Sequence, residues 1–319
     1  MTLKPQTITT ITLNPAIDEA LSIDAIAVGE TNRCNLDCFD PGGKGINASR
    51  VIRRLGRETM ALGFAGGITG ALLRARLAEE MVPHELLEAP GSTRVNVMLY
   101  ERTNGRCTRL YLPGQPLASE HLDALRRRLR SLEDGAVVVV GGSLPPGLPV
   151  ETYRELCGWL RERGARVFLD TSGPPLDAAL ASKPWLVKPD IEEAQELLGY
   201  TITSDADALR AASELRARGP RYVVISQGKN GAVGVGPEGA WKTVAPLVAA
   251  QSTVGSGDSM VAGLAIAFAE DRGLAEGLRL GCAAGAATAL RIGTHLCDVA
   301  DIERLLAEVT VEPCAVGSV

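Results

Sequence analysis

The sequence predicts an α/β fold built around a mainly parallel sheet. Short runs rich in β-branched residues alternate with longer helical patterns over most of the 319 residues, as in successive βαβ units. The plainest buried strands are predicted at 135–140, 166–170 and 221–226, and each run stops at a polar residue or a glycine. Ligands of open α/β sheets gather beyond the carboxyl ends of the strands. The segments expected to meet there are 141–147, 170–173, 188–190 and 226–231.

Two segments break the alternation and predict a small separate sheet. Residues 20–40 and 91–112 contain short extended patterns with no long helix between them, and 93–100 has one polar face. We expect a lid that closes over a substrate, with a simple surface hairpin as the alternative. No repeat or linker indicates a second domain, so 1–319 is expected to be one domain. Its core would comprise 1–19, 41–90 and 113–319, with a loose tail from Val309.

Composition excludes several classes of function. The chain has 33 Lys and Arg against 38 Asp and Glu, so its net charge of −5 disfavours nucleic acid as a partner. Aromatic residues make up only 4%, which disfavours base-stacking surfaces. The chain has no apolar run of about 18 residues and no leader pattern in 1–15. We therefore expect a cytoplasmic protein with no membrane partner.

The cysteines predict reduced thiols rather than a disulfide framework. Their number is odd, seven, and they are scattered along a long chain. Cys34 and Cys38 form the only close pair. Because this pair has neither a second cysteine pair nor a histidine nearby in the sequence, we do not expect a zinc site there.

The strongest chemical signal is the segment 251–263. Apolar residues follow it at helical spacing, so Gly255, Ser256 and Gly257 should form the loop and first turn of a buried helix. Free amides at such a helix start favour an anion, in particular a phosphate. Asp258 beside them could be a general base for a hydroxyl, although capping the helix is the alternative role. A P-loop, a dinucleotide fingerprint and a serine-hydrolase elbow are all absent.

Two further segments could hold a hydroxylated ligand. Glycines in 41–45 let a ligand approach the backbone closely, and Asn47 follows them one helical turn later. A structural turn with a solvent-facing Asn47 is the alternative. Asp18 follows the first apolar strand and could accept hydrogen bonds from vicinal hydroxyls, whereas alone it would be a turn residue.

Taken together, these motifs resemble the PfkB-type, ribokinase-like carbohydrate kinases, in the branch of phosphofructokinases and tagatose-6-phosphate kinases. The resemblance covers essentially the whole chain, and its motifs follow the family order. They are TLNPAID at 12–18, PGGKGIN at 41–47, STRVNV at 92–97, GSLPPG at 142–147, LVKPD at 186–190 and STVGSGDSMVAG at 252–263. The resemblance implies a ribokinase-like three-layer α/β/α sandwich, ATP and Mg²⁺ as cofactors, phosphorylation of a sugar phosphate and a homodimer formed through the lid.

The resemblance also implies roles for particular residues. Asp258 would be the catalytic base, and the amides of Gly255, Ser256 and Gly257 would form the anion hole. Arg94 would bind the phosphate already on the substrate, which suits a bidentate guanidinium. The residues expected to contact the sugar phosphate besides Arg94 are Asp18, Gly42, Gly43, Lys44, Asn47, Asn96 and Ser143. The residues expected near the nucleotide are Lys188, Asp190, Ser226, Gly228, Gly231, Ser252, Gly255 and Gly257, with Asp190 and Glu193 near magnesium.

Two positions depart from the family pattern. Asp190 stands where the family usually has Asn, which places an extra carboxylate near the expected metal site, and Ser256 stands where the family usually has Ala. Lys44 has the alternative role of a solvated surface cation.

The sequence leaves the sugar phosphate open. Residues 112–114 and 293–297 most closely resemble PfkB-type 6-phosphofructokinases, which favours fructose 6-phosphate phosphorylated at O1. Residues 42–45 and 94–97 also resemble 1-phosphofructokinases, and tagatose 6-phosphate is a third candidate. A non-catalytic sensor of nucleotide and sugar is the alternative from another class.

Overall fold

The large sheet has the predicted parallel core. The computed structural model describes residues 6–314, and these contain a ten-stranded sheet in the spatial order β14-β13-β12-β11-β10-β9-β8-β1-β4-β5. Its strands are β1 (Ile8–Thr12), β4 (Thr59–Ala65), β5 (His84–Glu88), β8 (Val137–Gly141), β9 (Arg166–Asp170), β10 (Leu186–Val187), β11 (Tyr222–Ser226), β12 (Ala232–Gly236), β13 (Gly239–Val244) and β14 (Thr310–Cys314). Pairing is parallel from β11 to β5 and antiparallel at β12, β13 and β14.

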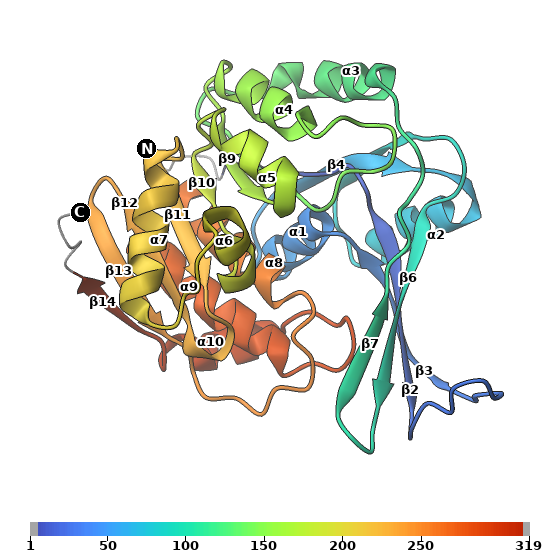
Figure 1. Ribbon diagram of the computed structural model, residues 1–319. Coiled ribbons are helices and arrows are strands. Elements are labelled where there is room, and N and C mark those ends of the chain that lie inside the picture. The colour runs from blue at the N-terminus through green and yellow to red at the C-terminus, as the bar shows by residue number, and fades with distance from the viewer. Residues whose placement is uncertain (1–5, 315–319) are drawn as a thin grey trace.

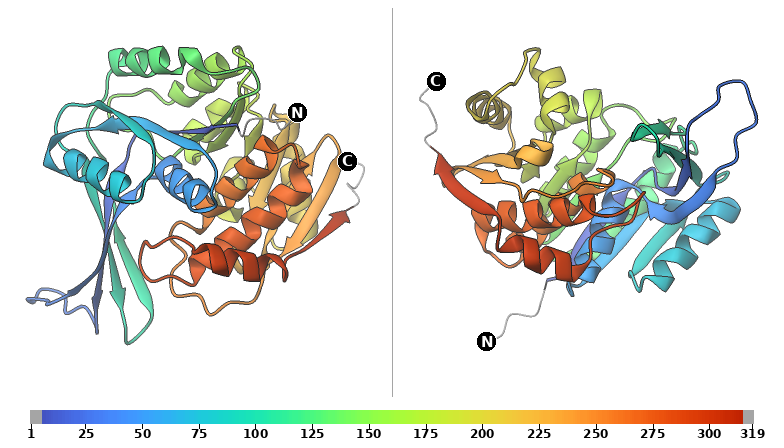
Figure 2. Two further views of the ribbon diagram at one scale, coloured as in Figure 1. Left: turned by 180° about the vertical axis from the view of Figure 1, so that it is seen from behind. Right: turned by 90° about the horizontal axis from the view of Figure 1, so that it is seen from below.

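Helices cover both faces of this sheet (Figures 1 and 2). In β8, Val138 and Val140 pack into one core and Val137 and Val139 into the other, because successive side chains of a strand point to opposite faces. One face carries α3 (Ser119–Arg128), α4 (Thr152–Arg161), α5 (Gly173–Leu180), α6 (Ile191–Leu198) and α7 (Asp205–Ala217). The other carries α1 (Lys44–Arg54), α2 (Gly67–Glu79), α8 (Ser256–Ala269), α9 (Gly273–Ala289) and α10 (Val299–Leu306). The predicted three-layer sandwich is confirmed.

The second sheet stands away from this body, as Figure 1 shows. It has the order β3-β2-β6-β7, formed by β2 (Ala16–Ile23), β3 (Asn35–Gly42), β6 (Arg94–Glu101) and β7 (Arg106–Leu110). It is therefore more than the surface hairpin considered as an alternative. β2 begins before the expected segment 20–40, and β3 ends after it. Ala16, at the start of β2, pairs with Gly42 on β3 and with Arg94 on β6. This extension brings the sheet to the start of α1.

The loose tail expected from Val309 is wrong for the residues that the structure describes. Val309 is buried, and β14 pairs antiparallel with β13 along its whole length. Pro313 is tolerated because β14 is the edge strand, where the missing amide hydrogen breaks no ladder. Residues 315–319 of the expected tail lie outside the described part of the chain.

The cysteines and helices of the described residues can be compared with the expectations from the sequence. All seven cysteines are free thiols. In the described part of the chain, no helix is both long and apolar enough to cross a membrane. Two short 3₁₀ helices, η1 (Leu129–Ser131) and η2 (Gly228–Asn230), are also present.

Candidate active site

The start of α8 forms an open set of backbone donors. Gly255 precedes the helix with φ of 79°, a left-handed conformation that favours glycine, and a Cβ there would lie 2.6 Å from Leu296. Within residues 6–314, the amides of Gly255, Gly257 and Asp258 have no hydrogen-bond acceptor. The Ser256 amide makes a long bond of 3.3 Å to the Thr253 carbonyl, and its buried hydroxyl has no partner among the described residues. These donors and the helix dipole favour a bound anion.

Asp258 lies in the first turn of α8 and faces α1. Its carboxylate accepts a hydrogen bond of 2.8 Å from the Asn47 side-chain amide, and it does not cap the helix. Burial raises the pKa of the Asp258 carboxyl to about 6, against the lowering effect of Lys44 and of the Asn47 hydrogen bond. A carboxylate with such a pKa is a suitable general base near neutral pH.

A buried arginine fixes the orientation of Asn47. Arg50 is 1% exposed, and one of its terminal nitrogens donates to Asn47 Oδ1 at 3.3 Å and to the Pro41 carbonyl at 2.8 Å. Its other donors bind Glu80 at 2.7–3.0 Å in a bidentate pair. Because Arg50 holds the oxygen of the Asn47 amide, the amide nitrogen is left to face Asp258. Asn47 is thus buried rather than solvent-facing.

Two lysines converge on a buried carboxylate beside the anion hole. Asp170, at the end of β9, is 2% exposed, and its Oδ1 lies 2.8 Å from Lys44 Nζ and 3.7 Å from Lys188 Nζ. Burial alone would raise the pKa of Asp170, but Lys188 and Lys44 outweigh it and lower that pKa. A Cβ on Gly257 would lie 3.4 Å from Lys188 Nζ, so the lysine reaches the start of α8. Lys44 is thus ion-paired with Asp170 near the start of α8, and its side chain is 34% exposed.

The small sheet contributes a second cluster, around Asp18. Asp18 on β2 accepts a hydrogen bond of 2.8 Å from the amide of Asn96 on β6, while Asn96 Oδ1 is buried without a partner among the described residues. Burial raises the pKa of Asp18. A Cβ on Gly42 would lie 2.2 Å from Asp18 Oδ2, so only glycine fits beside this carboxylate. At Gly43, φ is 116° and α1 begins, which again suits glycine.

Arg94 lies at the base of the same sheet. Its guanidinium donates to the carbonyls of Leu112 at 2.8 Å and Asn14 at 2.9 Å. The Asn14 side chain in turn donates to the hydroxyl of Ser143 at 3.1 Å. These contacts bring the segments 12–18, 92–97 and 142–147 to one place and leave further guanidinium hydrogens for an anion. Burial lowers the pKa of Arg94, partly offset by Asp18.

Asp190 and Glu193 form a capping box at the start of α6. Asp190 Oδ1 accepts from the Glu193 amide, and Glu193 Oε2 accepts from the Asp190 amide, both at 2.9 Å. The other oxygen of Glu193 lies 3.9 Å from Lys44 Nζ, on the side of the lysine pair. Each carboxylate thus uses one oxygen for the helix. The free Glu193 oxygen fits a Mg²⁺ ion held through water, which is the usual way carboxylates bind it.

The remaining expected nucleotide residues lie in two places. Ser226 ends β11 and bridges to Asp190, and Gly228 begins η2 next to it. Gly231, with φ of 94°, sits where a Cβ would lie 2.3 Å from the Thr243 carbonyl. Ser252 is elsewhere, because its buried hydroxyl pairs at 2.9 Å with the hydroxyl of Tyr100 from the small sheet. In the structure, Ser252 therefore contacts the small sheet.

Three residues organise this site without a role predicted from the sequence, although residues 170–173 were expected at this edge of the sheet. Arg50 orients Asn47, Asp170 gathers the two lysines, and Tyr100 joins β6 to the core. For Arg50 the available signal was an arginine three residues after Asn47 on the apolar side of a predicted helix. For Asp170 it was an acid directly at the end of a buried strand. Tyr100 gave no comparable signal.

Fold and site together define an enzyme that transfers a phosphoryl group to a small molecule. Free amides beside a buried carboxylate, with a small sheet next to them, are the arrangement that phosphoryl transfer to a hydroxyl requires. Residues 11–301 match the family model described as pfkB family carbohydrate kinase. The chain belongs to this family and is a kinase that phosphorylates a sugar hydroxyl.

Individual relatives match more than nine-tenths of the chain. The ATP-dependent 6-phosphofructokinase isozyme 2 of Escherichia coli is 39% identical over 93% of this chain and 97% of its own length. The 1-phosphofructokinase of Bacillus subtilis is 36% identical over 95% and 98%. The crystal structure of the Escherichia coli phosphofructokinase-2 in complex with substrates and products has a TM-score of 0.90 and 38% identity, covering 95% of this chain and 99% of that one. The ribokinase-like fold implied by the motifs is confirmed.

Proposed function

We propose that this protein transfers the terminal phosphoryl group of ATP to O1 of fructose 6-phosphate, giving fructose 1,6-bisphosphate. The observation that carries the proposal is that Asp258 and the free amides lie together in the first turn of α8. Arg94 on the small sheet adds a guanidinium beside Asp18. Base, anion hole and phosphate anchor are the parts that this reaction needs. The position of Asp258 beside these free amides argues against a sensor without turnover.

Each group of residues has a separate role in the proposed reaction. Asp258 accepts the proton of the attacking hydroxyl, and Asn47 keeps its carboxylate turned toward that hydroxyl. The amides of Gly255, Gly257 and Asp258 hold the charge that develops on the transferring group, together with Lys188 and Lys44. Glu193, with Asp190 at the same helix start, would hold Mg²⁺, which when bound neutralises the phosphates of ATP.

The acceptor side favours a sugar that already carries a phosphate. Asp18 and the unpartnered oxygen of Asn96 provide acceptors for sugar hydroxyls. Arg94 and Ser143, joined through Asn14, provide donors for an anion at the far end of the sugar. An uncharged sugar would leave the Arg94 guanidinium without an anion.

A second candidate is phosphorylation of fructose 1-phosphate at O6, which gives the same product. It is favoured by the Bacillus subtilis relative, named a 1-phosphofructokinase, and by Lys44 in the glycine turn. Tagatose 6-phosphate comes third.

A coupled assay of ADP release should compare kcat/KM for the three sugar phosphates. We expect fructose 6-phosphate to be at least tenfold better; a higher value for either competitor would refute the assignment.

We also propose that two copies associate through the small sheets. Opposed residues Leu21 and Leu36, and Val97 and Leu110, give the outer face an apolar surface, with Leu36 and Leu110 more than half exposed. Such a patch supports burial against a second copy. A relative from Escherichia coli has been described in a tetrameric inhibited form. The expected cytoplasmic location stays a prediction.

A further inference from the structure

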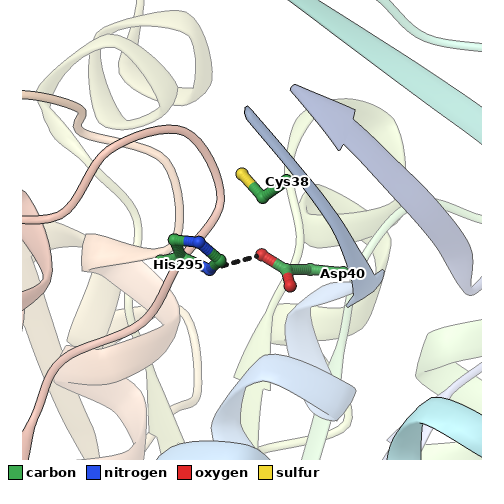
Figure 3. A group of neighbouring side chains, drawn as sticks. All are labelled: Cys38, Asp40 and His295. Atoms are coloured by element: carbon green, nitrogen blue, oxygen red, sulfur yellow. Dashed lines mark ion pairs between the residues drawn. The ribbon is translucent and has the colours of Figure 1, made fainter. Parts of the chain in front are cut away.

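A cluster of metal-ligating side chains lies outside the sugar and nucleotide positions described above. Cys38 and Asp40 lie two residues apart on β3, and His295 lies on the loop between α9 and α10 (Figure 3). Their sulfur, oxygen and nitrogen atoms all lie within 4.8 Å of one another. His295 Nδ1 is 3.1 Å from Asp40 Oδ2. Cys38 thus lies near His295 in space, although no histidine is close to Cys38 in the sequence.

We propose that Cys38, Asp40 and His295 bind a divalent transition-metal ion of the zinc class, which fastens the lid to the core. A thiolate, a carboxylate and an imidazole are a donor set that suits Zn²⁺. Tetrahedral zinc with bonds of about 2.0–2.3 Å needs its ligand atoms roughly 3.5 Å apart. The ligand atoms lie within 4.8 Å of one another, so those farthest apart would approach by about 1 Å on binding. Rotation of the side chains can supply such a shift.

Neighbouring groups hold these ligands in place. The Thr294 hydroxyl donates to Asp40 Oδ2 at 2.8 Å, and the Thr294 amide donates to Cys38 Sγ at 3.4 Å. Arg50 lies 3.9 Å from the other oxygen of Asp40, but its charge is already paired with Glu80. Such outer contacts orient ligands toward a metal.

The site is open to solvent on one side. The side chain of His295 is 51% exposed, whereas Cys38 is buried. An ion can therefore enter past His295 and keep a water molecule as its fourth ligand. On binding, the Cys38 thiol loses its proton to solvent, and neutral His295 contributes a lone pair. The charges of thiolate and carboxylate then balance the two positive charges of the ion.

The ion would join a moving part to a fixed one. The loop that carries His295 is anchored to α1, because Arg54 donates to the carbonyls of Leu296 at 2.7 Å and Cys297 at 3.1 Å. Asp40 belongs to the small sheet and is paired directly with Asp18 of the sugar site. If the proposed kinase function holds, a metal here restrains the lid and slows turnover.

Cobalt(II) titrated into the reduced, magnesium-free full-length chain tests the site directly. We expect a thiolate-to-cobalt charge-transfer band in the near ultraviolet and tetrahedral visible bands, both lost on adding Zn²⁺. His295→Gln changes an exposed ring and should fold normally, yet weaken Co²⁺ binding at least about tenfold. Cys38→Ser should abolish the charge-transfer band. Cys34→Ser, at an exposed thiol nearby, is the matched control and should leave both bands intact. Absence of the band, or its survival in Cys38→Ser, would overturn the proposal.

A separate measurement tests the effect on the lid. With Mg²⁺ and ATP in excess, Zn²⁺ should lower kcat severalfold in the wild type and not in His295→Gln. Equal inhibition of both proteins would refute the restraint of the lid. An inactive wild type that still shows the cobalt band would refute the proposed kinase function and leave the metal site standing.

Discussion

At the scale of residues, the proposed chemistry depends on how neighbouring groups shift the pKa of Asp258. Burial pushes its pKa up to about 6, while Lys44 and the Asn47 amide pull it down. Asn47 can do so only because Arg50 holds the other end of its amide. The pKa of Asp258 thus depends on Asn47 and, through it, on Arg50.

The pH dependence of kcat/KM should report this tuning. Asp258 accepts a proton only when it is ionised, so kcat/KM should be level near neutral pH and fall about tenfold per unit well below pH 6. In Asn47→Leu the carboxylate loses a donor that favours its charged form, so the inflection should move to higher pH. The phosphate of the substrate titrates identically in both proteins and cannot cause this shift. An inflection that stays in place would contradict the role of Asn47.

Replacing Arg94 should affect the sugar phosphate and not the nucleotide. In Arg94→Ala, KM for the sugar phosphate should rise about 10- to 100-fold, as expected for the loss of hydrogen bonds to a charged group. KM for ATP should stay within about twofold. Arg106→Ala, at an exposed arginine of the same sheet, is the control and should change neither constant. Equal rises in both constants would show that Arg94 has no specific role toward the substrate phosphate.

At the scale of elements, α1 and α2 are joined by the buried pair of Arg50 and Glu80. Arg50 is almost fully buried, and Glu80 supplies both oxygens to it from the end of α2. Arg50 and Arg54 hold the pKa of Glu80 below its usual value although burial acts in the opposite direction. The pair thus supports both the helix contact and the orientation of Asn47.

Glu80→Gln should lower the free energy of unfolding by about 2 kcal/mol, because it leaves a buried guanidinium without its counter-charge. Glu79→Gln is the matched control, since Glu79 pairs with Arg76 on the surface and should change stability by less than about 0.5 kcal/mol. Urea unfolding with unchanged m values measures both. Equal destabilisation by the two substitutions would contradict the importance of the buried pair.

Local sequence patterns predicted the helices and strands better than the long-range contacts between them. The buried strand β8 and the start of α8, with Gly255 and Asp258, could be predicted because short-range apolar spacing and glycine geometry determine them. The contact of Asn47 with Asp258 joins residues 211 positions apart, and no local pattern encodes it. The same holds for Lys44 and Asp170. The edge strand β14 was missed because its pairing with β13, rather than its own short pattern, makes it a strand.

At the scale of the whole molecule, side chains of the small sheet contact the loops around α9 and α8. Tyr100 on β6 contacts Ser252 and the Gly293 carbonyl, and Asp40 on β3 contacts Thr294 and His295. The inner face of the small sheet carries Asp18 and Asn96, while its outer face carries the exposed Leu36 and Leu110. In the proposed function, the inner face binds the sugar and the outer face binds a second copy.

Disrupting the outer face should separate the proposed dimer. We expect light scattering after gel filtration to give twice the chain mass for the wild type and the single chain mass for Leu110→Asp, because a buried charge would be unpaired. Val150→Asp, at a partly exposed position beside α4, should remain dimeric. A dimeric Leu110→Asp protein would place the interface elsewhere.

The central claim is that Asp258 takes the proton of the acceptor hydroxyl, and Asp258→Asn tests it most directly. Steady-state turnover should be measured together with calorimetric binding of ATP and of fructose 6-phosphate to the same protein. The account predicts that kcat falls about 10²- to 10⁴-fold while both ligands bind as tightly as to the wild type. A variant that keeps kcat within about twofold of the wild type would contradict it.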